Sequence, residues 1–280
     1  MVTINDLRSK YGEYPLESIM VISKLLKVDK SYIYTYGDKV VEDEVKDNYI
    51  DIMENIKSGY PIQYILGERE FMGLDFYLEE GVLIPRPDTE ILVEYIIDYA
   101  KKRYGDENIK ILDLGIGSGA ISLSVAHYLK NTIVYGVDIS EMAIKVANIN
   151  KDRFKLSNVE FYKGDLFQAL TGLSLEGEFH IIASNPPYIA TKEIQNLDIK
   201  VRGFEPRLAL EGGLDGLDFY RKITPMSKKY LQNQGLLIYE IGYDQGEKVK
   251  DILTLEGFKE VKILKDLQGL DRVVLGLKNG

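Results

Sequence analysis

The feature that most constrains the fold is a regular alternation of short apolar runs and helix-like segments from residue 108 onward. Helix-like segments, as at 120–130 and 140–150, separate runs that we predict to be strands. These runs lie at 109–114, 132–138, 159–162, 179–183 and 236–241. Such alternation predicts an α/β fold, with a mostly parallel sheet and helices on both faces. We expect a last pair, 261–264 and 272–277, to form an antiparallel hairpin that closes one edge of the sheet.

The first 67 residues follow a different pattern. Apolar residues recur at helical spacing within 16–26 and again within 45–56. We interpret residues 1–67 as a small helical domain; the alternative is an extension that packs on the main domain. Residues 68–84 alternate apolar and polar side chains and contain two glycines, which predicts a β-hairpin linker. The main domain would then span 85–280.

Composition excludes several classes of function. The net charge of -9 and the sequence pI of about 5.0 argue against nonspecific binding of nucleic acid, which needs a cationic face. Without cysteine, the chain has no disulfide, thiolate metal site or cysteine nucleophile. His127 and His180 are far apart in sequence, so we expect no metal site. No apolar stretch approaches the ~20 residues of a membrane span. No signal-peptide pattern opens the chain, so we expect a cytoplasmic protein.

A glycine-rich loop follows the first predicted strand of the main domain. Asp113 and Leu114 precede the sequence Gly-Ile-Gly-Ser-Gly at 115–119. Glycines permit positive φ and a close approach of a ligand to the backbone, and the following helix offers free N–H groups. Asp138 ends the next strand, where a carboxylate can accept both hydroxyl hydrogens of a ribose. The loop and Asp138 together suggest a cofactor that contains a nucleoside.

The spacing within the loop favours S-adenosylmethionine. A dinucleotide-binding loop is G-x-G-x-x-G, whereas this loop is G-x-G-x-G after an aspartate. S-adenosylmethionine carries an α-amino acid, whose amine Asp113 or the loop carbonyls can bind and whose carboxylate the loop N–H groups can bind. A dinucleotide and a purely structural turn remain alternatives at this point. The predicted cofactor-binding residues here are Asp113, Gly115, Ile116, Gly117, Ser118, Gly119 and Asp138.

A second short turn follows the third strand. Asp165 could accept a hydrogen bond from the exocyclic amine of an adenine. Leu166 or Phe167 could cover the ring. An ordinary turn is the alternative.

The sequence Asn-Pro-Pro-Tyr at 185–188 follows the fourth strand. Proline has no N–H to continue a sheet ladder, so the strand ends in a rigid ledge. This ledge suits methylation of a planar nitrogen whose lone pair is delocalised. The Asn185 side-chain oxygen and the Pro186 backbone oxygen can each accept one N–H of that nitrogen, and Tyr188 offers a flat face. The rate gain would come from positioning and fixed dipoles. A proline-terminated strand without chemistry is the alternative.

Several motifs together resemble the HemK/PrmC family of release-factor glutamine methyltransferases. NPPY at 185–188 and DLGIGSG at 113–119 are typical of S-adenosylmethionine-dependent amino-methyltransferases. The resemblance to the family itself covers the chain from about residue 60 and rests on four further stretches. These are GEREFMGLDF at 67–76, IPRPDTE at 84–90, FEPRLALEGGLDGLDFYR at 204–221 and YEIGYDQG at 239–246.

The resemblance implies a Rossmann-like methyltransferase domain and a helical N-terminal domain that engages the release factor. The reaction it implies is N5-methylation of the glutamine in the Gly-Gly-Gln motif of peptide chain release factors. Asn185, Pro186, Pro187 and Tyr188 would hold that glutamine, with Asn185 also near the cofactor. Arg86 and Glu90 would lie near the cofactor and the entrance. Many members have Trp where this chain has Leu166, which leaves that adenine contact in question. We expect a monomer.

Three other activities compete with this interpretation. An adenine-N6 DNA methyltransferase shares NPPY, but it needs a basic groove and a target-recognition region that the sequence does not indicate. A methyltransferase of another protein glutamine would have the same chemistry. An NAD-dependent oxidoreductase needs the longer glycine spacing and a proton-relay residue. A non-catalytic binding module would have little use for the NPPY ledge.

Overall fold

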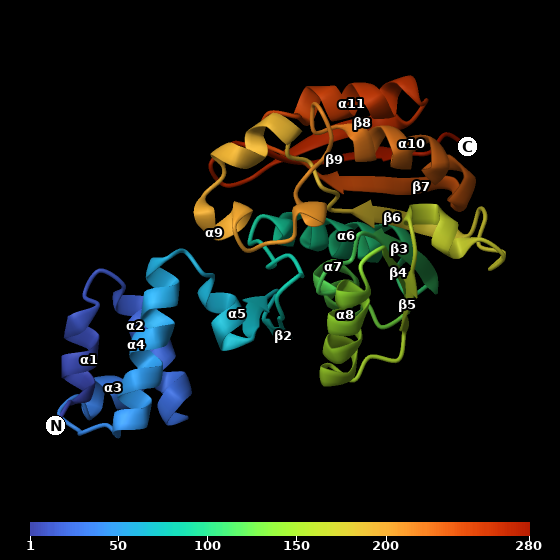
Figure 1. The fold of residues 1–280 in the computed structure, drawn as a ribbon. Helices are drawn as coiled ribbons and strands as arrows, with labels where there is room; N and C mark the ends of the chain where they lie inside the picture. The colour runs from blue at the N-terminus through green and yellow to red at the C-terminus, as the bar shows by residue number, and fades with distance from the viewer. The chain divides into compact units, whose positions relative to one another are not determined.

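The computed structural model describes all residues from 1 to 280, and the chain divides into two compact units (Figure 1). The helical unit comprises residues 1–68 together with 198–204. The sheet unit comprises residues 69–197 and 205–280. Each unit has its own hydrophobic core.

The helical unit is built from short amphipathic helices. They are α1 (Ile4–Lys10), α2 (Pro15–Leu26), α3 (Lys30–Thr35), α4 (Asp43–Lys57) and α5 (Ile62–Leu66). Thr3 caps α1 and forms a capping box with Asp6, and Pro15 occupies the first turn of α2. The helices predicted within 16–26 and 45–56 correspond to α2 and α4.

The core of the helical unit contains one buried polar group of note. Tyr49 is fully buried, and its hydroxyl lies 2.7 Å from Ser18 Oγ and donates to the Leu7 carbonyl at 3.0 Å. The polar end of this large side chain is therefore satisfied inside the core.

A short segment from late in the sequence completes the helical unit. Helix α9 (Ile199–Arg202) belongs to it. A Cβ added to Gly59 would lie 2.7 Å from the Ile199 side chain, so the absence of a side chain at Gly59 makes room for Ile199. The ring of Phe204 meets Tyr60 edge to face, with centroids 5.2 Å apart. Nothing in the sequence pattern predicted that 198–204 would join the first helices.

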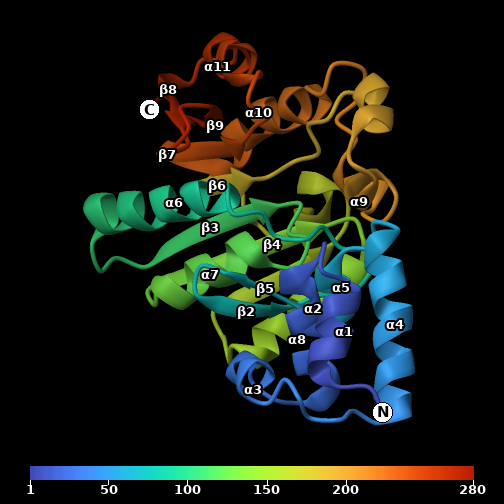
Figure 2. The same ribbon diagram turned by 90° about the vertical axis from the view of Figure 1, so that its left-hand side faces the viewer.

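The sheet unit contains a seven-stranded sheet in the order β5-β4-β3-β6-β7-β9-β8, whose central strands Figure 2 shows one above another. The strands are β3 (Ile109–Leu114), β4 (Thr132–Asp138), β5 (Val159–Lys163), β6 (Phe179–Ser184), β7 (Leu231–Glu240), β8 (Lys259–Lys265) and β9 (Asp271–Leu277). Strands β3 to β7 pair in parallel, and β9 pairs antiparallel with both β7 and β8. The predicted mostly parallel sheet with an antiparallel edge hairpin is confirmed.

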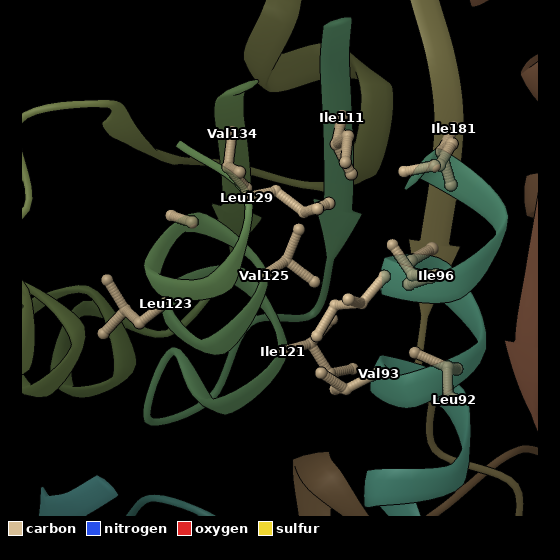
Figure 3. Close-up of a cluster of buried hydrophobic side chains, with 14 of the residues drawn as sticks. Leu92, Val93, Ile96, Ile111, Ile121, Leu123, Val125, Leu129, Val134 and Ile181 are labelled. Atoms are coloured by element: carbon tan, nitrogen blue, oxygen red, sulfur yellow. The ribbon is translucent and has the colours of Figure 1, made fainter. Parts of the chain in front are cut away.

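Helices cover both faces of the sheet (Figure 1). Along β3, Ile111 faces the core cluster of α6 (Thr89–Tyr104) and α7 (Ala120–Tyr128), while Leu112 faces the cluster of α10 (Asp218–Tyr230) and α11 (Gly246–Leu255). A strand buried on both faces shows a continuous apolar run, which is the pattern that the sequence has there. Figure 3 shows α6 and α7 packed together over β3 and β6. Helix α8 (Glu141–Arg153) follows β4.

The linker differs in part from the predicted hairpin. Strands β1 (Glu68–Phe71) and β2 (Leu74–Tyr77) pair with each other, but residues 78–84 form no strand. Leu78, Val82 and Ile84 are nevertheless buried. The alternation beyond Tyr77 therefore reflects burial of single apolar side chains and not strand pairing. The chain contains no helix that is both long and apolar enough to span a lipid bilayer.

Candidate active site

The loops that follow β3, β4, β5 and β6 meet at the carboxyl edge of the sheet and border one cleft. Ligands of open α/β sheets bind at this edge, and the cleft is open to solvent there. The predicted site residues among those that line it are Arg86, Gly115, Ile116, Gly117, Ser118, Asp138, Asp165, Leu166, Asn185, Pro186 and Pro187. Asp113, Gly119, Tyr188 and Glu90 are not among them.

The glycine loop has the positive φ angles that its three glycines predicted. Gly115, Gly117 and Gly119 have φ of 79°, 55° and 83°, which an L-residue rarely adopts. A Cβ added to Gly117 would find no atom nearer than 4.0 Å, so this glycine leaves open space. A Cβ on Gly119 would lie 2.8 Å from Leu123 Cδ1, so Gly119 serves the packing of the α7 N-terminus.

Asp113 is a buried carboxyl behind the loop. Its Oδ2 accepts from the backbone N–H of Ser122 at 3.1 Å and from the Ser122 hydroxyl, which ties β3 to α7. Its Oδ1 has no hydrogen-bond partner. Burial is the main cause that raises the pKa of Asp113 to about 7, against the lowering effect of Ser122. A buried acceptor with an unused oxygen is a group that a cationic amine would satisfy.

Asp138 is held by backbone groups at the end of β4. Its Oδ2 accepts from Gly117 N–H at 2.9 Å, and its Oδ1 accepts from Ser140 N–H at 2.8 Å. Burial raises the pKa of Asp138, and these backbone hydrogen bonds oppose the rise. Each oxygen keeps a further lone pair, so the carboxylate is fixed in place and can still accept ligand hydroxyls.

In the turn after β5, Leu166 and Phe167 lie in different surroundings. Leu166 lines the cleft beside Asp165 and has a positive φ of 45°. Phe167 is buried and stacks on Tyr230 with centroids 4.8 Å apart. Of the two residues considered as a cover for an adenine, only Leu166 is at the cleft.

The NPPY ledge begins one residue after the end of β6. Pro186 and Pro187 line the cleft, and Asn185 Nδ2 donates to Thr89 Oγ1 at 3.3 Å. Tyr188 packs against the core cluster of α10 and α11, and burial raises the pKa of its hydroxyl. The tyrosine therefore anchors the ledge in the core in this structure.

Two glycines and one glutamine hold the backbone of the ledge. A Cβ on Gly212 would lie 2.6 Å from the Pro187 carbonyl oxygen, and a Cβ on Gly216 would clash with the Tyr188 carbonyl. The Gln245 side chain donates to that same Tyr188 carbonyl at 2.9 Å. The motifs at 204–221 and 239–246 thus act in part by supporting the ledge, a role that close glycine spacing in 212–216 could have indicated.

Arg86 and Glu90 have different surroundings. Arg86 pairs with Glu205, whose side chain is only 2% exposed, so the ion pair links the motifs at 84–90 and 204–221 at the cleft. Burial raises the pKa of Glu205, and Arg86 opposes the rise. Glu90 instead accepts from the backbone N–H of Met72 at 2.8 Å, in the turn of the β1–β2 hairpin.

Sequence reasoning assigned no role to several residues at this edge. Pro206, Leu208 and Phe219 line the cleft. Thr89 and Glu240 are buried next to Asn185. Their positions depend on contacts between distant segments, which no local spacing reveals.

Comparison with known proteins decides the family. Residues 3–67 match the family model of the PrmC N-terminal domain, and residues 105–238 match that of a methyltransferase domain. The release factor glutamine methyltransferase of Clostridium acetobutylicum is 44% identical over 268 residues, which are 95% of this chain and 92% of that protein. The chain belongs to the release factor glutamine methyltransferase family. The family resemblance that the motifs indicated is confirmed.

One further relative agrees with this assignment, and one solved structure shows the fold. The release factor glutamine methyltransferase of Thermodesulfovibrio yellowstonii is 38% identical over 272 residues, which are 97% of this chain and 95% of that protein. A solved methyltransferase structure from Pyrococcus furiosus is 20% identical, with a TM-score of 0.52, over 82% of this chain and 99% of that one. That structure shows the shared fold.

Proposed function

We propose that this chain transfers a methyl group from S-adenosylmethionine to the side-chain amide nitrogen (N5) of the glutamine in the Gly-Gly-Gln motif of peptide chain release factors. The observation that carries the proposal is one cleft lined both by the glycine loop with Asp138 and by Asn185 and Pro186. Membership of the release factor glutamine methyltransferase family supports the assignment of a release factor as the substrate.

The residues present fit S-adenosylmethionine, which supplies an electrophilic methyl group on a sulfonium. Asp138 would accept from the ribose hydroxyls, because the backbone already fixes its carboxylate. Asp113 has an unpartnered buried oxygen that suits the amine of the amino-acid part. Asp165 and Leu166 would contact the adenine.

Asn185 and Pro186 would orient the substrate amide. Asn185 directs its NH₂ toward Thr89, which leaves its side-chain oxygen to accept an N–H of the substrate. The Pro186 carbonyl would accept the other N–H. The nitrogen loses its proton only after it has become cationic, so positioning by fixed acceptors is the main contribution of the protein.

The helical unit would engage the release factor. Its match to the PrmC N-terminal domain supports this role. The sheet unit would then methylate the glutamine, with the protein acting as a monomer.

A labelled-methyl experiment tests the function. The protein is mixed with isotope-labelled S-adenosylmethionine and an unmethylated release factor, and label is mapped by peptide mass spectrometry. We expect one methyl group on the glutamine of Gly-Gly-Gln, and none when that glutamine is replaced by alanine. Label on adenine of added DNA, with none on the release factor, would overturn the substrate and leave the amino-methyltransferase chemistry.

A further inference from the structure

Glu240 is a buried carboxyl at the end of the strand next to the ledge. Strands β6 and β7 pair in parallel up to Ser184 and Tyr239. Asn185, just past the end of β6, therefore lies beside Glu240, the last residue of β7, which still pairs with Val273 of β9. Glu240 is only 2% exposed, and its Oε2 has no hydrogen-bond partner. Such a group is costly to bury and calls for a physical reason.

Thr89, Asn185 and Glu240 form one side-chain network. Asn185 Nδ2 donates to the Thr89 hydroxyl at 3.3 Å. Both side chains lie near enough to the Glu240 carboxyl to lower its pKa, against the effect of burial. The three residues come from the start of α6 and from the ends of β6 and β7. Thr89 is 4% exposed and Glu240 2%, while Asn185, at the cleft, is half-buried.

Of Thr89 and Glu240, Glu240 is the one that can select which way the Asn185 amide points. A threonine hydroxyl both donates and accepts, so Thr89 tolerates either end of an amide. An ionised carboxylate only accepts, so the end of the amide that faces Glu240 has to be the NH₂. The opposite end, the oxygen, is then the one left for a ligand.

We propose that Glu240 is a positioning residue that holds the Asn185 amide with its oxygen toward the substrate nitrogen; this inference rests on the proposed function. The reversed amide would present NH₂ to a substrate that also carries N–H groups, and the substrate would lose one of its two acceptors. Glu240 acts through Asn185 and does not touch the substrate.

The charge state of Glu240 makes this role depend on pH. Burial raises the pKa of Glu240 to about 7, and Asp88 adds to the rise, while the hydrogen bonds of Thr89 and Asn185 and the charge of Arg272 oppose it. Burial raises the pKa of the Tyr188 and Tyr220 hydroxyls, and the charge of Glu240 adds to each rise. The Tyr220 hydroxyl donates to the Glu240 backbone carbonyl at 2.9 Å. Protonated Glu240 can donate to the Asn185 oxygen, which would turn the amide round. We therefore expect kcat to rise with pH through about 7.

The test uses Glu240→Gln and Glu240→Asp in the full chain. Gln keeps the size but can donate to the Asn185 oxygen, so we expect kcat to fall at least about tenfold, with KM for the release factor and Kd for S-adenosylmethionine within twofold. The rise of kcat near pH 7 should vanish in Glu240→Gln. Glu240→Asp keeps a carboxylate and should retain the pH-dependent rise.

A matched control is Tyr239→Phe. Tyr239 is the preceding buried residue of β7, and its hydroxyl bonds Thr224 on the other side of the sheet. Its removal tests the effect of a lost buried hydrogen bond in the same strand, so Tm should fall while kcat and its pH profile stay as in the wild type. An equal loss of kcat in Tyr239→Phe and Glu240→Gln would overturn the proposal.

An NMR measurement without substrate tests the role of Glu240 independently of the proposed methylation of release factors. In ¹⁵N-labelled protein, the Asn185 side-chain NH₂ signal is assigned by its absence in Asn185→Ala. We expect it to shift with a midpoint near pH 7 in the wild type and to be pH-independent in Glu240→Gln. A pH-independent wild-type signal would overturn the role of Glu240, whereas a failure to methylate release factors with the NMR result intact would overturn only the function.

Discussion

The two units treat buried polar groups in opposite ways. In the helical unit, the buried Tyr49 hydroxyl is bonded to Ser18 and to the Leu7 carbonyl. In the sheet unit, Asp113, Glu205 and Glu240 each keep one buried oxygen without a partner. None of the three lines the cleft, but each adjoins a residue that does: Asp113 precedes Leu114, Glu205 pairs with Arg86 and Glu240 lies beside Asn185. Unsatisfied buried groups reduce stability. Two others in the sheet unit, Ser124 Oγ and His127 Nδ1, lie in α7. The three carboxyls that adjoin the cleft indicate that this region is organised for binding and catalysis, while the helical unit is organised for packing.

The largest predicted effect tests the catalytic role of the sheet unit and concerns the kcat of an Asn185 variant. Loss of an oriented acceptor at the reacting nitrogen should lower kcat at least about 10²-fold, so we expect Asn185→Ala to abolish measurable turnover. The affinity for S-adenosylmethionine should stay nearly unchanged. Methyl transfer measured beside calorimetric titration of the cofactor checks both points, and a loss of cofactor binding would contradict the role given to Asn185.

The second effect is the dependence of stability on pH. Burial raises the pKa of Asp113 and of Glu240 to about 7, so the folded state binds more protons than the unfolded state between about pH 4.5 and pH 7. The free energy of unfolding should therefore fall as pH rises through this range, by about 3 kcal/mol for Glu240 alone. Urea unfolding at pH 5 and pH 7.5 measures it. Glu240→Gln should show a smaller fall, and an identical fall would contradict the assignment.

The third effect is on cofactor affinity. Removal of the Asp138 carboxylate should weaken S-adenosylmethionine binding by a charge-assisted hydrogen bond, about 1.5–3 kcal/mol. Calorimetry on Asp138→Ala gives the dissociation constant directly. An unchanged constant would remove Asp138 from the site, while Tyr49→Phe in the helical unit serves as the control that should leave this constant as it is.

The smallest effect belongs to the helical unit. Thr3 accepts from the backbone N–H of Asp6 at 3.2 Å and caps α1. Thr3→Ala should lower the free energy of unfolding by about 1 kcal/mol, whereas Thr3→Ser should keep the cap. Cofactor affinity and kcat at saturating release factor should not change. A change in cofactor affinity would contradict the prediction that this cap affects only the stability of the helical unit.

The α/β architecture and the local motifs of the site follow from the amino-acid sequence alone. Buried parallel strands need apolar runs, and the loops between strand and helix need glycine or proline where the backbone takes unusual geometry. Both are properties of consecutive residues. The glycine loop, Asp138 and NPPY are therefore recognisable in the order of the residues, and their meeting at one edge follows from parallel strands.

The distant side chains that complete the edge are identified only by the three-dimensional arrangement of the chain. Arg86 meets Glu205 across 119 positions and Asn185 meets Thr89 across 96, while Glu240 joins them from the end of β7. The same arrangement places Glu90 at a hairpin turn, Phe167 in the core and 198–204 with the first helices. The physical reason is that hydrogen bonds, ion pairs and desolvation act over a few ångströms in space. The distance along the chain between two residues does not predict them.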